Sequence, residues 1–422
     1  MKSKALHLIY ICTCVTLILM VSCKDDDEPL PSQGLPGVTL QSTLIFYIVG
    51  ENSLANYMAA DTLEIAAALS QIPEDARVVV YIDDHISSRI SVGTRHQPMQ
   101  CVKTYPDNVC STDSAGMLMV LRDIMQAYPA RHYALACNSH ASGWLLDDPA
   151  SKKAPPRRSF GIDNGRRSAN SNSGVKMNIP TMARVLKQLP HFDYILFDAC
   201  FMQCVEVAYE LRHVTDFLIG SPAEIPGDGA PYDIILPQMC QLPATKQTVA
   251  EIVKGYGDYY VQGEGSAIYQ GVELSACATA HLEALAMATK LYIPPLFCNR
   301  STPDCTAVQH YNPSLRSSVY AEFYDLEHLI YSLQPWAEAE WFSALDEAVF
   351  CKYGSNYWMS AIDPKGYLSR YIHYEYISDE DLAHCSFISV YVPMSRHDQL
   401  GWTTDYHEME WYRAAGLSFT GW

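Results

Sequence analysis

The sequence contains few charged residues and lacks the patterns that identify many common binding sites. Charged residues make up 18% of the 422 residues and hydrophobic residues 49%, a balance that excludes intrinsic disorder and supports a large buried core. No two cysteines have the C-x-x-C spacing, so a zinc site of that kind is not indicated. No stretch resembles an EF-hand loop. The sequence therefore requires no cofactor, and a dependence on calcium is left open.

Basic residues are outnumbered by acidic ones. The chain has 29 lysines and arginines against 47 aspartates and glutamates, which gives a formal net charge of -18 at pH 7. This charge argues against a nucleic-acid partner and against electrostatic binding to anionic membranes. It suits a cationic substrate, although excess acid more often serves only solubility. The composition does not indicate the oligomeric state.

A hydrophobic run long enough to span a membrane is also lacking at the N-terminus. The apolar stretch at 8–21 is short for a transmembrane helix and follows two lysines, which is typical of a signal peptide. The sequence Met20-Val-Ser-Cys23 resembles a bacterial lipobox. We therefore expect a lipoprotein signal peptide at 1–22, cleavage before Cys23, and a lipid on its thiol that anchors the chain in a membrane.

An acidic, proline-rich linker is expected at 23–41. Its run Lys24-Asp-Asp-Asp-Glu28 resembles the signal that sends lipoproteins of Bacteroidetes-type bacteria to the cell surface, although an ordinary solvated linker has a similar composition. The expected location is the outer membrane of a Gram-negative bacterium, at the cell surface.

Eleven cysteines follow Cys23. An exported protein can pair some of them, and the spacings of Cys298/Cys305 and Cys101/Cys110 suit small disulfide loops. Most of the others are expected to be small, buried apolar residues.

Short apolar runs alternate with helical patterns along the first part of the chain. Strands are predicted at 43–49, 77–82, 133–140, 192–200 and 216–220, and helices at 55–69, 115–128, 179–189 and 202–213. This alternation predicts an α/β fold with a mostly parallel sheet flanked by helices. Further predictions are a polar hairpin or loop at 85–110, a long loop at 145–175, and apolar helix positions at Met58, Leu63 and Ala67. We expect one domain at 42–265 and an additional C-terminal α+β region at 266–422 packed on it.

Two of the predicted strands stop at reactive residues. One runs from Tyr133 to His140 and the other from Phe192 to Cys200. The chain between them is long enough for a helical crossover, so the strands can lie side by side and parallel. Ligands of open α/β sheets bind at the carboxyl edge of the strands, and a thiol beside an imidazole is a nucleophile with a base.

Cys200 and His140, taken singly, each also have a simpler, non-catalytic interpretation. Cys200 lies where a strand is expected to turn into a helix, and a helix N-terminus favours a thiolate and offers N–H groups to an oxyanion. A cysteine in a core strand is nevertheless common. His140 alone fits a strand-end histidine satisfied by a hydrogen bond. The two residues at corresponding strand ends make the catalytic interpretation the stronger one.

Four motifs together resemble a known family. They are His140-Ala-Ser-Gly-Trp144, Asp198-Ala-Cys-Phe-Met202, Val205-Glu-Val-Ala-Tyr-Glu-Leu211 and Pro226-Gly-Asp-Gly229. They are similar to motifs of the clostripain family of caspase-like (clan CD) cysteine peptidases, and the resemblance spans about 42 to 422. It implies a caspase-like peptidase domain at 42–265 and cleavage of protein or peptide substrates after Arg or Lys.

The resemblance also implies residue roles. Cys200 is the nucleophile, His140 is the acid/base partner, and the N–H groups of Ala141 and Cys200 form the oxyanion hole. Asp198 and Asp228 match the acidic residues of the pocket for the basic side chain. From the sequence alone, Asp198 also fits a helix cap and Asp228 a turn residue.

Three positions depart from the family pattern. Ala141 replaces a glycine, which matters only if that position needs a positive φ. Gln203 and Cys204 follow Met202, where small and polar residues are expected from the family. Cys204 is expected one helical turn from Cys200, close enough to oxidise with it.

Two further hypotheses are left open. The loop at 145–175 contains three basic pairs at which such a peptidase can cut itself: Lys152-Lys153, Arg157-Arg158 and Arg166-Arg167. A catalytically weak or inactive caspase-like surface lipoprotein that binds peptides or proteins is the alternative to an active enzyme. A metal-dependent hydrolase has no ligand spacing to support it.

Overall fold

The computed structural model describes residues 39–145, 159–165, 174–261, 271–311, 323–362, 368–399 and 401–422. All of them belong to one compact unit, residues 32–422. The expected signal peptide, the expected lipidation site Cys23 and the three basic pairs of the 145–175 loop lie outside the described residues. Among the described residues, no helix combines the length and the apolar character needed to cross a membrane.

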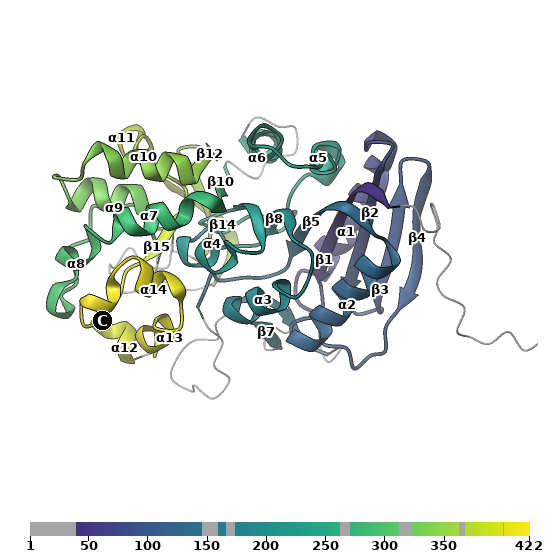
Figure 1. Cartoon of the computed structure of the whole chain (residues 1–422), viewed down its shortest axis with the longest axis horizontal. Helices are drawn as coiled ribbons and strands as arrows, with labels where there is room; N and C mark the ends of the chain where they lie inside the picture. The colour runs from purple at the N-terminus through teal and green to yellow at the C-terminus, as the bar shows by residue number, and fades with distance from the viewer. Residues whose placement is uncertain are drawn as a thin grey trace, which may run out of the picture. The chain divides into compact units, whose positions relative to one another are not determined.

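A nine-stranded sheet organises the described unit, in the order β12-β10-β9-β8-β5-β1-β2-β3-β4 (Figure 1). Its five central strands are parallel. They are β9 (Thr215–Gly220), β8 (Phe192–Asp198), β5 (Ala130–Asn138), β1 (Leu40–Val49) and β2 (Ala76–Asp83). Antiparallel strands complete both edges, β10 (Leu274–Ala278) and β12 (Val349–Tyr353) on one side, β3 (Ser88–Thr94) and β4 (Gln97–Thr104) on the other. The predicted α/β fold is confirmed, and the 85–110 segment contains a hairpin.

Alternating side chains of the central strands face two separate cores. On β1, Leu44, Phe46 and Ile48 belong to one core, and the residues between them belong to the other. Helices α1 (Ala55–Ala68), α5 (Tyr232–Met239) and α6 (Lys246–Val261) contribute to the first core. Helices α2 (Ser114–Ala127), α3 (Ile179–Leu186) and α4 (Val205–Leu211) contribute to the second. The sheet is thus covered on both faces, which is why its central strands read as continuous apolar runs.

Helix α1 buries Met58 as predicted, but the rest of its buried face differs from the one that its apolar spacing predicts. Its buried residues are Met58, Asp61, Ile65 and Ala68, whereas Leu63 is 72% exposed. The prediction of Leu63 and Ala67 as core positions is therefore wrong. The reason is that α1 packs on α5, and this contact turns Asp61 toward the interior.

The segment predicted as a long loop contains one short strand, β6 (Phe160–Asp163), which pairs with β7 (Val175–Met177) at the end of the segment. The C-terminal region supplies the edge strands β10 and β12 and adds smaller elements. These are α7 (Leu282–Thr289), α8 (Ile293–Leu296), β11 (Phe323–Asp325), α9 (Leu326–Leu333), α10 (Ala339–Ala348), β13 (Tyr357–Ile362), β14 (Leu368–Tyr376), α11 (Asp379–Leu382), β15 (Ser389–Tyr391), α12 (Ser395–Gln399), α13 (Trp402–Tyr406) and α14 (Glu410–Ala414). The expected C-terminal α+β region is present, but it completes the central sheet as well as packing beside it.

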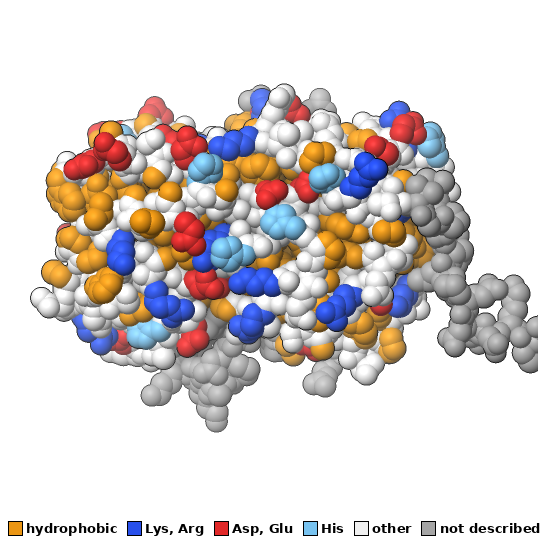
Figure 2. Space-filling model, viewed as in Figure 1, with side chains coloured by type: hydrophobic (Ala, Val, Ile, Leu, Met, Phe, Trp, Pro, Cys, Tyr) orange, Lys and Arg blue, Asp and Glu red, His pale blue; other side chains and the backbone are white. Residues whose placement is uncertain are grey.

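The eleven cysteines after Cys23 all lie in the described residues, and all are free thiols. The small disulfide loops suggested by the spacings Cys298/Cys305 and Cys101/Cys110 are not formed. On the face of the molecule in Figure 2, basic and acidic side chains are interspersed.

Candidate active site

The pairing of three central strands sets the geometry of the site. Asn138 at the end of β5 is in register with Asp198 at the end of β8 and with Ile48 on β1. His140 and Cys200 each follow two residues later, so they leave neighbouring parallel strands at the same level of the carboxyl edge. The structure thus brings together the two strand ends that the sequence singled out.

His140 has a hydroxyl neighbour that sequence reasoning missed. The Oγ of Ser53, in the turn after β1, lies 2.8 Å from His140 Nε2. The His140 carbonyl accepts a hydrogen bond from Gly161 N at 2.9 Å, which fixes the backbone of the histidine against β6. Nothing in the local sequence of Ser53 marks it as a partner of His140, because the contact joins residues 87 positions apart.

Ala141 adopts an ordinary backbone conformation, since it is not among the residues with positive φ. An alanine therefore fits where the family has glycine. Its neighbours are bonded to β6 through the His140 carbonyl and to the residue before β6 through Ser142 N, which donates to Ser159 O at 3.3 Å. Because successive peptide groups of an extended chain point to opposite sides, the Ala141 N–H is directed away from β6.

Gly143 is required by its geometry. Its φ is +65°, and a Cβ there would lie 3.0 Å from the Phe201 carbonyl oxygen and 2.9 Å from the Phe323 ring. A side chain at 143 would therefore push against the backbone that follows Cys200. The adjacent Trp144 is fully buried.

Cys200 is half-buried and precedes a strained turn. Its Sγ accepts a hydrogen bond from Ile225 N at 3.5 Å. Phe201 has a φ of +61°, a conformation that costs a non-glycine residue about 1–3 kcal/mol and is frequent at functional sites. Backbone bonds from Phe201 N to Ala223 O and from Gln203 N to Ser221 O, each 2.9 Å, hold this turn.

The helix predicted at 202–213 begins later than expected, so Cys200 does not lie directly at a helix N-terminus. Helix α4 begins at Val205, and Cys204 is its N-cap. The strained turn at Phe201 separates the strand from the helix. Residues 200 and 204 are therefore not one helical turn apart. Burial raises the pKa of the Cys204 thiol well above its ordinary value, which makes this second thiol a poor redox partner.

Asp198 is only 5% exposed and accepts hydrogen bonds on both oxygens. Its Oδ2 accepts from Ala230 N at 2.9 Å, the Tyr232 hydroxyl at 2.8 Å and Asn138 Nδ2 at 3.1 Å. Its Oδ1 accepts from the Tyr256 hydroxyl at 2.8 Å. Burial raises its pKa, and these donors oppose the rise. Asp198 does not cap α4, so the interpretation as a helix cap is wrong.

Asp228 is exposed and lies in a tight turn. The turn closes through a 3.0 Å hydrogen bond from Gly229 N to Pro226 O. Gly229 has a φ of +66°, and a Cβ there would lie 2.6 Å from Asp198 Oδ2. The turn therefore brings the backbone next to Asp228 into close contact with the buried carboxylate.

Asp61 and Glu64 of α1 interact electrostatically with Asp198 and Asp228, and we call these four residues the acidic cluster. Asp61 and Glu64 were missed from the sequence. Burial, reinforced by Asp198 and Glu64, raises the pKa of Asp61 to about 9. Burial, reinforced by Asp233, raises the pKa of Glu64 to about 7, although its Oε2 accepts a 3.2 Å hydrogen bond from Tyr232 N. No Lys or Arg among the described residues forms an ion pair with Asp61, Glu64, Asp198 or Asp228. The cluster is electrostatically prepared for a cation.

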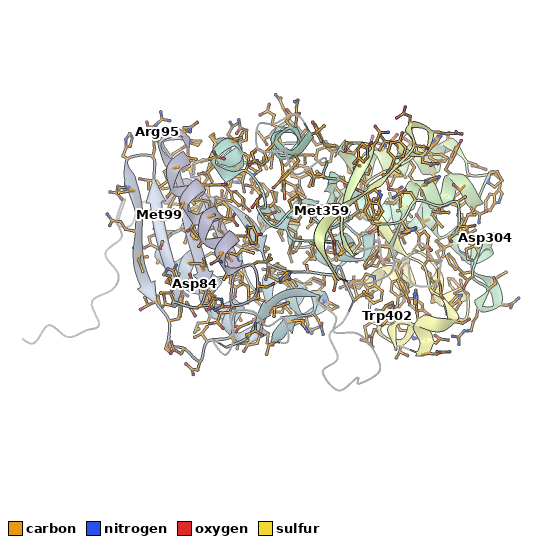
Figure 3. The ribbon with its side chains drawn as sticks, turned by 180° about the vertical axis from the view of Figure 1, so that it is seen from behind. Asp84, Arg95, Met99, Asp304, Met359 and Trp402 are labelled. Carbon is orange, nitrogen blue, oxygen red and sulfur yellow. The ribbon has the colours of Figure 1, made fainter. Side chains whose placement is uncertain are left out.

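A β-hairpin from the C-terminal region borders the site. Met359 of β13, labelled in Figure 3, forms an antiparallel bridge with Glu224, the residue before the Ile225 whose N–H reaches Cys200. In the described ranges from 39 to 422, no group of three or more His, Cys, Asp or Glu side chains is arranged to hold a metal ion.

Helix α4, which follows Cys200, packs against what we call the C-terminal buttress, formed by β15, α13 and α14. Glu206 Oε1 accepts hydrogen bonds from Tyr391 N at 2.8 Å and the Tyr406 hydroxyl at 3.0 Å. Glu210 Oε1 accepts from Glu410 N at 2.6 Å. Ser389 N donates to Gln203 O at 3.0 Å. Trp402 of α13 is labelled in Figure 3.

Glu206 is expected to make stability depend on pH. Burial raises its folded-state pKa from an ordinary 4.5 to about 7. Between these values the unfolded chain loses the proton first, so the stabilisation is complete below about pH 4.5 and is lost as pH rises to 7. The replacement Glu206→Gln should remove up to ~3 kcal/mol of this pH dependence. Urea unfolding at pH 5 and pH 8, in a Cys200→Ala background to prevent proteolysis, measures the difference; parallel pH profiles would contradict it.

Comparisons with known proteins identify the family of the chain. The model of the clostripain family, Peptidase_C11, matches residues 46–418. A secreted C11 cysteine protease from Bacteroides thetaiotaomicron, solved with an irreversible peptide inhibitor, is 28% identical, with a TM-score of 0.72 over 90% of this chain and 99% of that one. An inactive zymogen C11 protease from Parabacteroides distasonis is 24% identical, with a TM-score of 0.72 over the same shares. At that identity the second likeness supports the fold alone.

A search of curated proteins gives no significant match. The family match nevertheless covers most of the sequence and includes every motif on which the resemblance was based. The chain therefore belongs to the clostripain family, and it is a cysteine peptidase.

Proposed function

We propose that the protein is an endopeptidase that cleaves after Arg or Lys through a His140–Cys200 dyad and a thioester intermediate. The observation that carries the proposal is the strand register, which places the two residues at equivalent positions beyond Asn138 and Asp198 on neighbouring parallel strands. Both side chains leave the same edge of the sheet, where a peptide can reach them together.

The dyad would act in two stages. The Cys200 thiolate attacks the carbonyl carbon of the peptide bond, and the oxyanion accepts hydrogen bonds from the N–H groups of Ala141 and Cys200. His140 donates a proton to the leaving amine as the C–N bond breaks, which leaves a thioester. His140 then takes a proton from water as that water attacks the thioester. Collapse of this second intermediate releases the acid and restores the thiolate.

The acidic cluster supports the preference for a basic side chain. Four donors already occupy the oxygens of Asp198, so its chief contribution to a bound cation is charge in a buried setting. Asp228 is exposed and has a free approach for direct, charge-assisted bonds to a guanidinium or ammonium group. We assign the substrate pocket to these two carboxylates.

The location of the enzyme is also part of the proposal. The lipobox-like Met20–Cys23 and the acidic run after it support an exported lipoprotein anchored in the outer membrane and facing outward. The secreted C11 protease from Bacteroides thetaiotaomicron agrees with export. We propose a signal peptide at 1–22, a linker at 23–41, a peptidase domain at 42–265 and a C-terminal region at 266–422 packed on it.

A panel of fluorogenic peptides tests the specificity. Peptides that differ only in Arg, Lys, Asp or Ala at the cleavage position should be hydrolysed only when that residue is basic. Equal rates for all four would contradict the assigned pocket. Failure to hydrolyse any of them, together with slow iodoacetamide labelling of Cys200 at mildly acidic pH, would favour the peptide-binding surface lipoprotein instead.

A further inference from the structure

Ser53 occupies a distinctive place beside the site. It follows β1, which lies next to β5 in the sheet, and its Oγ is 2.8 Å from His140 Nε2. This separation is that of a good hydrogen bond. The serine side chain is exposed and the histidine is half-buried, so the contact lies on the accessible side of the ring.

The turn that carries Ser53 is fixed by its neighbour. Asn52 is fully buried, and its Nδ2 donates to Val49 O at 2.8 Å and to Ile162 O at 3.1 Å. Its Oδ1 accepts from Leu54 N at 2.9 Å. These bonds tie the turn to β1 and β6, and β6 also holds the His140 carbonyl. Ser53 and His140 are therefore set on the same rigid frame rather than on an independent loop.

A serine hydroxyl can accept a hydrogen bond from a ring N–H or donate one to a bare ring nitrogen. During the proposed reaction the imidazole alternates between neutral and doubly protonated forms. A hydroxyl that accepts from Nε2–H keeps the same bond in both forms, because Nε2 carries hydrogen in each. The other nitrogen, Nδ1, is then the one that gains and loses the proton.

We infer that Ser53 is a positioning residue: its hydroxyl holds Nε2–H of His140, so that Nδ1 is the nitrogen that exchanges a proton with the substrate. The inference rests on the proposed His140–Cys200 dyad. In the first stage Nδ1–H is transferred to the leaving amine, and in the second Nδ1 takes a proton from the attacking water. Ser53 itself neither gains nor loses a proton.

Removing the hydroxyl should affect turnover more than binding. Without it the ring can rotate or adopt the other neutral tautomer, which places a hydrogen rather than a lone pair on Nδ1 when the base is required. Misplacement of a catalytic group by about 1 Å can cost ~100-fold. We expect Ser53→Ala to lower kcat about 10- to 100-fold and to change KM by less than about twofold, because Ser53 is placed outside the substrate pocket.

Three companion variants separate this role from a general disturbance. Ser53→Thr keeps the hydroxyl and should retain most of kcat. Ser53→Asp adds a negative charge beside the ring, which favours imidazolium and should move the histidine-dependent limb of the kcat–pH profile to higher pH. Ser70→Ala, at an exposed serine of the turn after α1, is the matched control and should behave as the wild type.

The measurement is steady-state hydrolysis of an Arg-containing peptide across pH, with thermal unfolding to confirm that each variant is folded. If Ser53→Ala matches Ser70→Ala in kcat and pH profile while His140→Ala and Cys200→Ala are inactive, the inference is overturned and the dyad stands. If His140→Ala and Cys200→Ala are both active, the proposed function itself fails. A lower kcat in Ser53→Ala, together with a kcat near the wild-type value in Ser53→Thr, supports the inference.

Discussion

Replacing Cys200 by alanine will abolish peptide hydrolysis and leave the protein folded. Without the thiol no thioester forms, and loss of a catalytic nucleophile typically costs 10⁴-fold or more in kcat. The substitution removes a single half-buried sulfur atom, and alanine fills most of the remaining space. The change in stability should therefore be small. Progress curves with an Arg-containing fluorogenic peptide give the rate, and circular dichroism confirms the fold.

The surface thiol Cys298 supplies the control. It is exposed, lies outside the motif segments, and should tolerate Cys298→Ala without loss of rate. His140→Ala should reduce activity about as much as Cys200→Ala, and the double variant should be no worse, because two groups that act as one unit are not additive. A Cys200→Ala protein that retained more than about a tenth of the wild-type rate would contradict the dyad.

Replacing Asp198 by asparagine should have the second largest effect. Asparagine has the shape of aspartate, but an NH₂ group replaces one of the two acceptor oxygens. The donors that faced that oxygen then have no acceptor. With the Asn138 amide, the Ala230 N–H and two tyrosine hydroxyls around the carboxylate, we expect a loss of about 1–3 kcal/mol in stability. Removing the buried charge should lower kcat/KM for Arg peptides by roughly 10²- to 10³-fold, in line with about 2–5 kcal/mol for such pairs.

The matched comparison is Asp228→Asn. This carboxylate is exposed, so water and salt screen its interaction, and its removal should cost less in both stability and rate. The decisive measurement is the ratio of kcat/KM for Arg and Ala peptides, which corrects for any general damage. An unchanged ratio in Asp198→Asn would show that this residue is structural and does not select the substrate.

The parts of the site that lie on strands were predictable from the sequence. The apolar runs before His140 and Cys200 have the composition and length of buried parallel strands, and such strands end at one edge of a sheet. Their adjacency followed from the room for a helical crossover, which α3 fills. The edge strand β10 was missed because Leu274–Ala278 has only five residues and no alternating pattern.

The parts of the site that depend on distant contacts were not predictable. Ser53 approaches His140 only because β1 and β5 are neighbours. Asp61 is buried on the side of α1 that carries Met58 and Ile65, a position that the apolar spacing of the helix did not indicate. The N–H of Ile225 reaches Cys200 through a turn after β9. In each case the local sequence gives no signal, because the partner comes from another strand or helix.

The hydrogen bonds between α4 and the C-terminal buttress have a consequence for the order in which the protein folds. Glu206 and Glu210 accept their hydrogen bonds from residues 185 to 200 positions later in the chain. A nascent polypeptide that has not yet emerged as far as Tyr391 and Glu410 cannot complete these bonds. The buried carboxylates of Glu206 and Glu210 then lack their hydrogen-bond donors, and helix α4, which follows the Cys200 turn, is not held in place. The turn at Cys200 is therefore expected to become ordered only after the C-terminal region has folded against α4.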